Sequence, residues 1–117
     1  MLRVPEGAST PRLRVERNGQ RSPLRLALYG ELDIATAPTL ERVLTELADL
    51  EGELTIDVSA VRFIDSTGLR AILACAAKRR LTLSSPSPPV RRMLQVTGLL
   101  ERLTAPAIAS PPAGPAG

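Results

Sequence analysis

Residues 53–76, ELTIDVSAVRFIDSTGLRAILACA, carry the pattern that decides the fold. The opening stretch, residues 53–58, alternates polar and apolar side chains, which predicts a β-strand with one buried face. From Asp65 onward the apolar residues recur at the spacing of an amphipathic helix, as in Leu69 and Ile72. The stretch is therefore interpreted as a strand that leads into a helix.

The sequence before this stretch predicts a hairpin and a first helix. Residues 13–17 and 24–30 both alternate apolar with other side chains, and Asn18-Gly19 between them tolerates the positive φ of a tight turn. These two strands should therefore pair in antiparallel orientation. A helix follows, with Pro38 in its first turn and its end at Gly52. Because this helix joins two strands of one small sheet, those strands should be parallel, with a right-handed crossover.

The sequence after this stretch completes a small α/β domain. Lys78–Arg80 should close the second helix, because basic side chains complement the negative end of a helix dipole. A short strand at residues 81–84 and a third helix at residues 90–97 follow, Gly98 stops that helix, and residues 99–103 add one apolar turn. We predict an α/β fold with a mostly parallel sheet of four to five strands, one antiparallel edge strand, and helices packed on the sheet.

The chain of 117 residues is expected to form one domain. Residues 12–104 hold the predicted elements, residues 1–11 are expected to be a flexible N-terminal segment, and residues 105–117 a disordered tail rich in proline, alanine and glycine. No apolar run approaches the ~18 residues that span a membrane, and the N-terminus lacks the apolar region of a signal peptide. We therefore expect a cytoplasmic protein without membrane insertion.

The composition argues against several kinds of site. The chain has no histidine and a single cysteine, Cys75, so an internal disulfide is impossible and a histidine or thiolate metal site is not expected. Cys75 lies in an alanine-rich run and is interpreted as a small buried residue rather than a reactive thiol. Without histidine we find no nucleophile–base pair, so we predict that the protein is not an enzyme and uses no cofactor or metal.

The charge balance points to no particular partner. Fourteen arginines and one lysine stand against twelve acidic residues, for a net charge of +3. The sequence pI of about 10.0 follows from the absence of histidine, because almost nothing titrates between the carboxylates and the phenol. With two aromatic residues and no nucleic-acid motif, direct binding of nucleic acid is not predicted.

Two turns at the predicted carboxyl ends of strands are candidate sites, GELD at residues 30–33 and FIDSTGL at residues 63–69. In open α/β sheets, sites gather at this edge, where helix N-termini also present free amides. Ser66 and Thr67 place two hydroxyls at a helix start, and Gly68 is expected to clear space beside them. The residues alone leave two interpretations open. The serine either satisfies backbone amides as a cap, or accepts a phosphate that would meet those amides.

These two turns, together with LTIDVS at residues 54–59 and VRRMLQVTG at residues 90–98, resemble the STAS domain family, and more narrowly the bacterial anti-sigma factor antagonists. The resemblance covers about residues 12–104. It implies a protein that binds an anti-sigma factor, itself a serine kinase of the histidine-kinase-like ATPase fold. It also implies that this kinase phosphorylates the serine that corresponds to Ser66. The unphosphorylated antagonist would free a sigma factor, and a PP2C-type phosphatase would reset it.

Other residues of the two turns receive weaker assignments. We expect Asp33 and Asp65, at neighbouring strand ends, to frame the acceptor serine and to bind the kinase, but turn and cap chemistry explains them equally well. Thr67 is a second candidate phosphosite, and Gly68 belongs to the same partner-binding turn. Asp57 is expected to brace the following loop rather than to contact a partner. Leu32 and Ile34 are apolar residues in a turn, for which partner contact is an alternative, but we expect them to be buried.

The resemblance leaves an alternative class of partner open. The chain could instead be a STAS subunit of another assembly, either a stressosome scaffold or the small cytoplasmic subunit of a lipid-transport ABC complex. The complete DSTG motif at residues 65–68 favours a kinase substrate. The run AKRRL at residues 77–81 departs from the family pattern, in which the second helix is longer by about one turn. We expect a monomer or a weak dimer.

Overall fold

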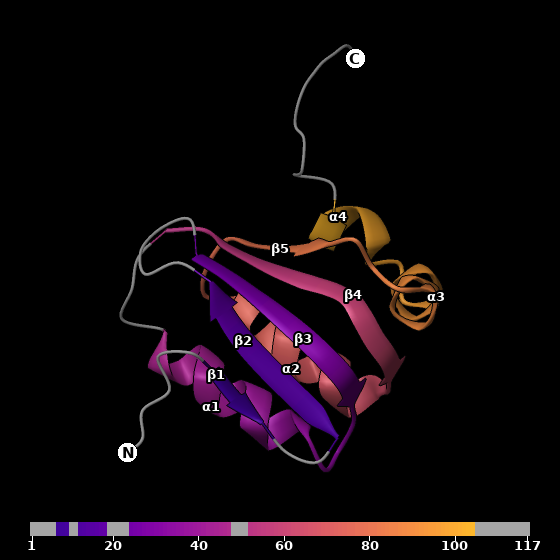
Figure 1. Cartoon of the computed structure of the whole chain (residues 1–117). Helices are drawn as coiled ribbons and strands as arrows, with labels where there is room; N and C mark the ends of the chain where they lie inside the picture. The colour runs from indigo at the N-terminus through magenta and orange to yellow at the C-terminus, as the bar shows by residue number, and fades with distance from the viewer. Residues whose placement is uncertain (1–6, 10–11, 19–23, 48–51, 105–117) are drawn as a thin grey trace.

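The computed structural model describes residues 7–9, 12–18, 24–47 and 52–104. Within these ranges it holds one five-stranded sheet of order β1-β2-β3-β4-β5 (Figure 1), and no helix long and apolar enough to cross a bilayer. The strands are β1 (Gly7–Ser9), β2 (Leu13–Asn18), β3 (Leu24–Leu32), β4 (Leu54–Ile64) and β5 (Leu81–Ser84). The helices are α1 (Ala37–Glu46), α2 (Ser66–Ala76), α3 (Pro88–Val96) and α4 (Leu100–Thr104).

The sheet is mixed, and its parallel half contains the helical crossovers. β3 pairs with β4 and β4 with β5 in parallel, whereas β1–β2 and β2–β3 are antiparallel. The predicted α/β fold is confirmed, with one antiparallel strand more than expected. That strand is β1, which lies within residues 1–11, the segment expected to be flexible. It pairs in the register Gly7↔Glu16 to Ser9↔Arg14 and so satisfies the outer edge of β2.

Two predictions about connecting segments concern residues outside the described ranges. The tight turn after Asn18 falls at residues 19–23, and the expected tail is residues 105–117. Both therefore stay predictions. The antiparallel pairing on either side of the turn is confirmed, because Asn18 faces Arg25 in the β2–β3 ladder.

One face of the sheet packs against α1 and α2, which lie side by side across it (Figure 1). Val15 faces Leu28 across β2–β3, and Leu26 faces Ile56 across β3–β4. Ile56 in turn faces Leu83 of β5. All five side chains are buried, so an apolar row crosses four strands. Each contributes about 1.5–3 kcal/mol relative to an exposed position, which makes this row the main stabilising feature of the sheet.

β4 continues well past its predicted end at Val58, to Ile64. The register of β4 against β3 slips by one residue after Asp57, as in a β-bulge. Inside this slip the Asp57 carboxylate accepts a hydrogen bond from the Ser59 backbone amide at 2.9 Å. The expectation that Asp57 braces a loop was wrong, because the segment after it is strand. Asp57 instead braces the irregular part of β4.

The C-terminal ends of α1 and α2 are joined by Arg79. Its Nη1 donates to the carbonyl oxygen of Leu47, the C-cap of α1, at 3.0 Å, and its Nη2 donates to that of Gly52 at 2.9 Å. The last carbonyls of a helix lack partners within the helix, so a guanidinium satisfies them well. The basic residues after α2 were predicted to complement the dipole of α2, which stays a prediction; the side-chain hydrogen bonds of Arg79 go to the end of α1 and to Gly52. α1 also ends at Glu46, before the predicted end at Gly52.

Candidate functional site

The two candidate turns meet at one edge of the sheet. Leu32 and Ile64 face each other at the carboxyl ends of the parallel strands β3 and β4. The backbone amide of Asp65 donates to the carbonyl oxygen of Leu32 at 3.0 Å, so the contact between the strands extends into the second turn. The structure therefore brings residues 30–33 and 63–69 together, as expected for neighbouring parallel strands.

Asp65 and Ser66 occupy different positions at the start of α2. Asp65 is the N-cap, and its Oδ1 accepts a hydrogen bond from the Gly68 backbone amide at 2.9 Å. Ser66 is the first helical residue and is exposed, whereas Thr67 is half-buried. Among the side-chain hydrogen bonds of the described residues, none involves the Ser66 hydroxyl. The capping interpretation therefore applies to Asp65, and the Ser66 hydroxyl lies at a helix turn whose first amides lack helical partners.

Gly68 is buried where α2 begins to pack against β3. A Cβ at this position would lie 2.7 Å from the carbonyl oxygen of Leu32 and 2.9 Å from the Leu32 Cβ. Both distances are shorter than van der Waals contact, and the oxygen belongs to backbone held in the sheet. Gly68 therefore permits the close approach of α2 to β3, rather than clearing space beside the two hydroxyls.

Asp33 is buried, with 8% of its surface exposed. Its Oδ1 accepts hydrogen bonds from the backbone amides of Ala35 at 3.0 Å and Thr36 at 3.1 Å, and Arg12 donates to its Oδ2 at 2.7 Å. Burial opposes the charged form, but the Thr36 amide, the Arg12 guanidinium and the Ala35 amide together hold the pKa of Asp33 below its ordinary value. The Asp33 carboxylate thus fixes the shape of the β3–α1 turn through contacts within the chain.

Arg12 connects the acidic side chains beside this turn. Its Nη1 lies 2.9 Å from a carboxylate oxygen of Glu31 as well as 2.7 Å from Asp33, and Arg62 lies 3.8 Å from the other oxygen of Glu31. The Glu31 backbone amide donates to the Arg12 carbonyl oxygen at 2.8 Å. Gly30 permits this approach, because its φ is +119° and a Cβ there would overlap that oxygen. Sequence reasoning missed Arg12, since no local pattern pairs residues 21 positions apart.

Two large apolar side chains are exposed on the two turns. Ile34 is 73% exposed in the β3–α1 turn, and Phe63 is 48% exposed near the end of β4. Leu32 is buried as expected, but the expectation of burial was wrong for Ile34. The exposure of Phe63 had a signal in the sequence: adjacent strand residues point to opposite faces, so Phe63 and Ile64 cannot both face the core. Ile64 is the buried one.

The acidic side chains and Cys75 are the residues of this chain with the chemistry of metal or thiol sites. Among the residues that the structure describes, no group of three or more cysteine, aspartate or glutamate side chains is placed to hold a metal ion. Cys75 is half-buried on α2 and packs against the core. Burial raises the pKa of its thiol, although the nearby charges of Arg79 and Lys78 act in the opposite direction. The Cys75 thiol is therefore protonated at neutral pH.

Comparison with known proteins identifies the family of this chain. The family model described as "Mlab, STAS domain" matches residues 15–105, which is most of the chain. This chain belongs to the STAS domain family. The matched range begins in β2 and runs through α4, so the STAS domain includes both turns of the candidate site.

Relatives of this STAS domain carry names from one class of regulator. It is 43% identical over 54 residues to the anti-sigma-F factor antagonist RsfB of Mycobacterium tuberculosis, an alignment that covers 45% of this chain and 44% of that protein. The chain thus spans less than half the length of RsfB in that match. It is 29% identical over 93 residues to the anti-sigma-B factor antagonist of Staphylococcus aureus, covering 74% of this chain and 86% of that protein.

Solved structures show the same arrangement of strands and helices. A crystal structure of an anti-sigma factor antagonist from Mycobacterium paratuberculosis matches with a TM-score of 0.68 and 26% identity, covering 83% of this chain and 87% of that one. The anti-sigma factor antagonist SpoIIAA in its unphosphorylated form matches with a TM-score of 0.60 and 21% identity, covering 84% of this chain and 99% of that one. At that identity the likeness to SpoIIAA supports the fold alone.

Proposed function

We propose that this STAS domain is an anti-sigma factor antagonist and that its partner, an anti-sigma factor with serine kinase activity and the histidine-kinase-like ATPase fold, phosphorylates it on Ser66. The observation that carries the proposal is the exposed Ser66 hydroxyl at the first position of α2, beside an aspartate that caps the helix. The names of the relatives support the same function. In this role the domain is a cytoplasmic binding protein and not an enzyme, and it acts as a monomer or weak dimer.

The proposed binding surface consists of Ser66 with the exposed side chains of Ile34 and Phe63. These two residues come from different turns that the Asp65–Leu32 backbone contact holds together. A partner that covers both turns buries two apolar side chains and the serine in a single contact. Large apolar side chains near the centre of an interface commonly contribute most of its binding free energy. Thr67, half-buried beside Ser66, supplies a second hydroxyl at the edge of this surface.

Phosphorylation would weaken the complex through charge at this surface. A phosphoserine carries a charge of about −1.5 to −2 at neutral pH, next to the carboxylate of Asp65. In the free protein the N-terminus of α2 offsets part of this charge, by about 0.3–1 kcal/mol. In a closed interface the phosphate must lose water and lie against groups that had packed on a hydroxyl, which costs several kcal/mol. A PP2C-type phosphatase would then restore the binding form.

Phosphopeptide mapping tests the proposal. The purified protein is incubated with ATP and a serine-kinase anti-sigma factor from the same genome, and the phosphopeptide is identified by mass spectrometry. We expect phosphate on Ser66, no labelling of Ser66→Ala, and normal labelling of Thr67→Ala. Phosphate found on Thr67 alone, or labelling of Ser66→Ala at the wild-type level, would contradict it.

A second experiment separates this proposal from the alternative assembly. A STAS subunit of a stressosome or of a lipid-transport ABC complex would form a stable complex with other partners. Purification of the tagged protein from its own cells, followed by identification of the bound proteins, distinguishes the two. Recovery of a permease or scaffold complex, without the kinase, would favour the alternative.

A further inference from the structure

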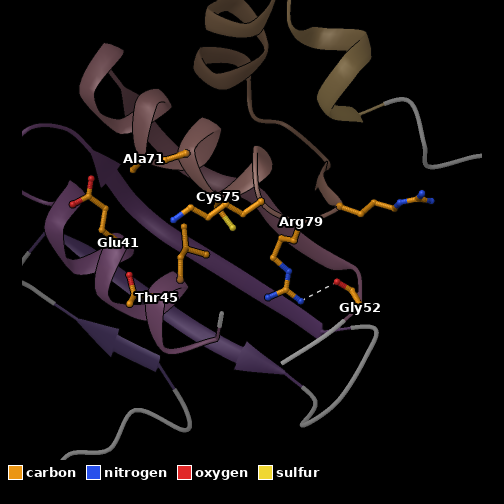
Figure 2. A pocket seen from close by; sticks show the side chains of 10 residues that line it. Glu41, Thr45, Gly52, Ala71, Cys75 and Arg79 are labelled. Carbon is orange, nitrogen blue, oxygen red and sulfur yellow. Dashed lines mark hydrogen bonds between the residues drawn. The ribbon is translucent and has the colours of Figure 1, made fainter. Parts of the chain in front are cut away.

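A cavity of about 680 Å³ lies between α1 and α2 (Figure 2). Each helix lines it with residues spaced by three and four positions, which share one helical face. The lining residues are Glu41, Leu44 and Thr45 on α1, and Ala71, Ala74 and Cys75 on α2. The α2 side chains are all small, so they leave open a volume that larger residues would fill. This volume is within the range of small-molecule sites.

The cavity lies away from the candidate site, toward the C-terminal half of α2. α2 begins at Ser66 and ends at Ala76, a length of about 15 Å at the rise of an α-helix. The residues that follow, Lys78, Arg79 and Arg80, complete the lining together with Gly52. The described lining is therefore apolar on α2, mixed on α1, where Glu41 and Thr45 flank Leu44, and basic at the end where α2 stops.

Arg79 leaves a hydrogen-bond donor without a partner at this basic end. Two of its guanidinium nitrogens are held by the carbonyl oxygens of Leu47 and Gly52, and Figure 2 shows the guanidinium directed at Gly52. Its Nε is buried and has no hydrogen-bond partner among the described residues. Because Nε has almost no solvent-accessible surface, a ligand in the cavity would meet the charge of this guanidinium rather than the free donor itself. Arg80 already has a carboxylate nearby, that of Glu53 at 3.7 Å.

We propose that this cavity binds an anionic amphiphile, with its carboxylate or phosphate head beside Lys78 and Arg79 and its aliphatic chain along Leu44, Ala71 and Cys75. Among the lining residues that the structure describes, three are basic and one, Glu41, is acidic, which favours an anionic head group. The apolar part of the lining, along Leu44, Ala71 and Cys75, disfavours a ligand that is charged throughout, and the basic end disfavours one that is apolar throughout. Binding here is separate from the partner contact at Ser66, since no residue is shared.

The single cysteine of the chain makes the cavity directly observable. Cys75 lines the cavity, and its rate of reaction with a disulfide reagent reports whether the cavity is filled. The rate is measured at mildly alkaline pH, because burial raises the pKa of the thiol. Decanoate, below its micelle concentration, should slow the reaction at least fivefold, and decyl phosphate should do the same. Acetate lacks the aliphatic chain and decanol lacks the charge, so neither should slow the reaction of Cys75.

Two variants and two controls locate the ligand. Ala74→Phe fills the cavity from an exposed position and should lower the affinity for decanoate at least tenfold. Lys78→Ala removes one positive charge and should lower this affinity at least threefold. Calorimetry measures both affinities. Arg91→Ala removes an exposed arginine of α3 outside the cavity and should leave the affinity unchanged, as should Ser66→Ala. Undiminished affinity in Ala74→Phe, absence of Cys75 protection, or equal protection by decanol would overturn the proposal. None of these results depends on phosphorylation of Ser66.

Discussion

The β3–α1 and β4–α2 turns each place an aspartate at the carboxyl end of a parallel strand, but they use it differently. Asp33 is buried and accepts hydrogen bonds from two backbone amides and from Arg12. Asp65 is half-buried, caps α2 through the Gly68 amide, and leaves the next residue exposed. The first turn is thus closed by its own contacts, whereas the second presents a hydroxyl at a helix start. Similar sequence positions therefore close one turn by internal contacts and leave an exposed serine in the other.

A negative charge on Ser66 should have the largest effect on binding of the anti-sigma factor, and it should leave the closed β3–α1 turn undisturbed. The phosphoprotein and Ser66→Asp should bind the anti-sigma factor about a hundredfold more weakly, equivalent to ~2.8 kcal/mol, because the charge must be desolvated in the interface. Ser66→Ala should retain binding. Calorimetric titration of the purified partner with each form measures the change.

Backbone amide spectra decide how this loss arises. If release comes from repulsion at the surface, phosphorylation should shift resonances of the two turns and leave those of the sheet in place. Shifts spread across the whole sheet would mean that the domain changes conformation, and the contrast between a fixed turn and a modifiable turn would fail.

Gly68→Ala should break the contact that joins the two turns. The added methyl would lie 2.7 Å from the Leu32 carbonyl oxygen, so α2 must move away from β3. We expect the free energy of unfolding to fall by about 2 kcal/mol, the usual range for overpacking a buried site. Arg70→Ala, an exposed change on the same helix, should cost less than about 0.5 kcal/mol. Urea denaturation measures the free energy of unfolding of both variants. Equal values for wild type and Gly68→Ala would show that α2 accommodates the methyl group without loss of stability.

Phe63→Ala should weaken partner binding and leave the domain folded. Its ring is 48% exposed, so we expect about a tenfold loss of affinity, ~1.4 kcal/mol, with unfolding free energy changed by less than that. Ile34→Ala, on the opposite turn, should act in the same direction. Val96→Ala is the matched control, because Val96 is also an exposed apolar residue, 76% exposed, on α3. A loss in Val96→Ala as large as in Phe63→Ala would place the interface elsewhere.

The strands and helices of this fold follow largely from local sequence patterns. The predictions differ from the structure where contacts between residues far apart in the sequence determine it. Alternation of apolar residues predicted the strands, and the DSTG motif located the helix start. The role of Arg79 at the end of α1 could not be predicted, because it joins residues 32 positions apart. For the same reason β1 was missed, since a three-residue strand has no pattern of its own and depends on β2 for pairing.

The sequence predicted the two turns of the candidate site, but not the contacts of Arg12, the exposure of Ile34, or the different roles of Asp65 and Ser66. Either Ser66 or Asp65 could cap a helix by propensity. The backbone conformation decides between them: Asp65 is extended, as an N-cap requires, and Ser66 is already helical. The exposure of Ile34 likewise depends on how the Asp33 carboxylate orders the turn around it, which no apolar periodicity encodes.

The smallest predicted effect concerns Asp33 and acid stability. Hydrogen bonds from Thr36, Arg12 and Ala35 outweigh burial and lower the pKa of Asp33 in the folded protein. The contribution of Asp33 to stability is therefore fully present above the ordinary pKa of about 3.9 and is lost as the pH falls through the lowered pKa, because the unfolded chain takes up the proton first.

Asp33→Asn cannot titrate, so it should be less stable than wild type at pH 7. The thermal midpoints of the two proteins should converge as the pH approaches 2. In an Arg12→Ala background, the difference in thermal midpoint at pH 7 between the protein with Asp33 and its Asp33→Asn variant should be smaller, because one of the groups that favour the carboxylate is gone. Parallel midpoint curves for wild type and Asp33→Asn from pH 7 to 2 would show that the turn does not hold Asp33 in its charged form.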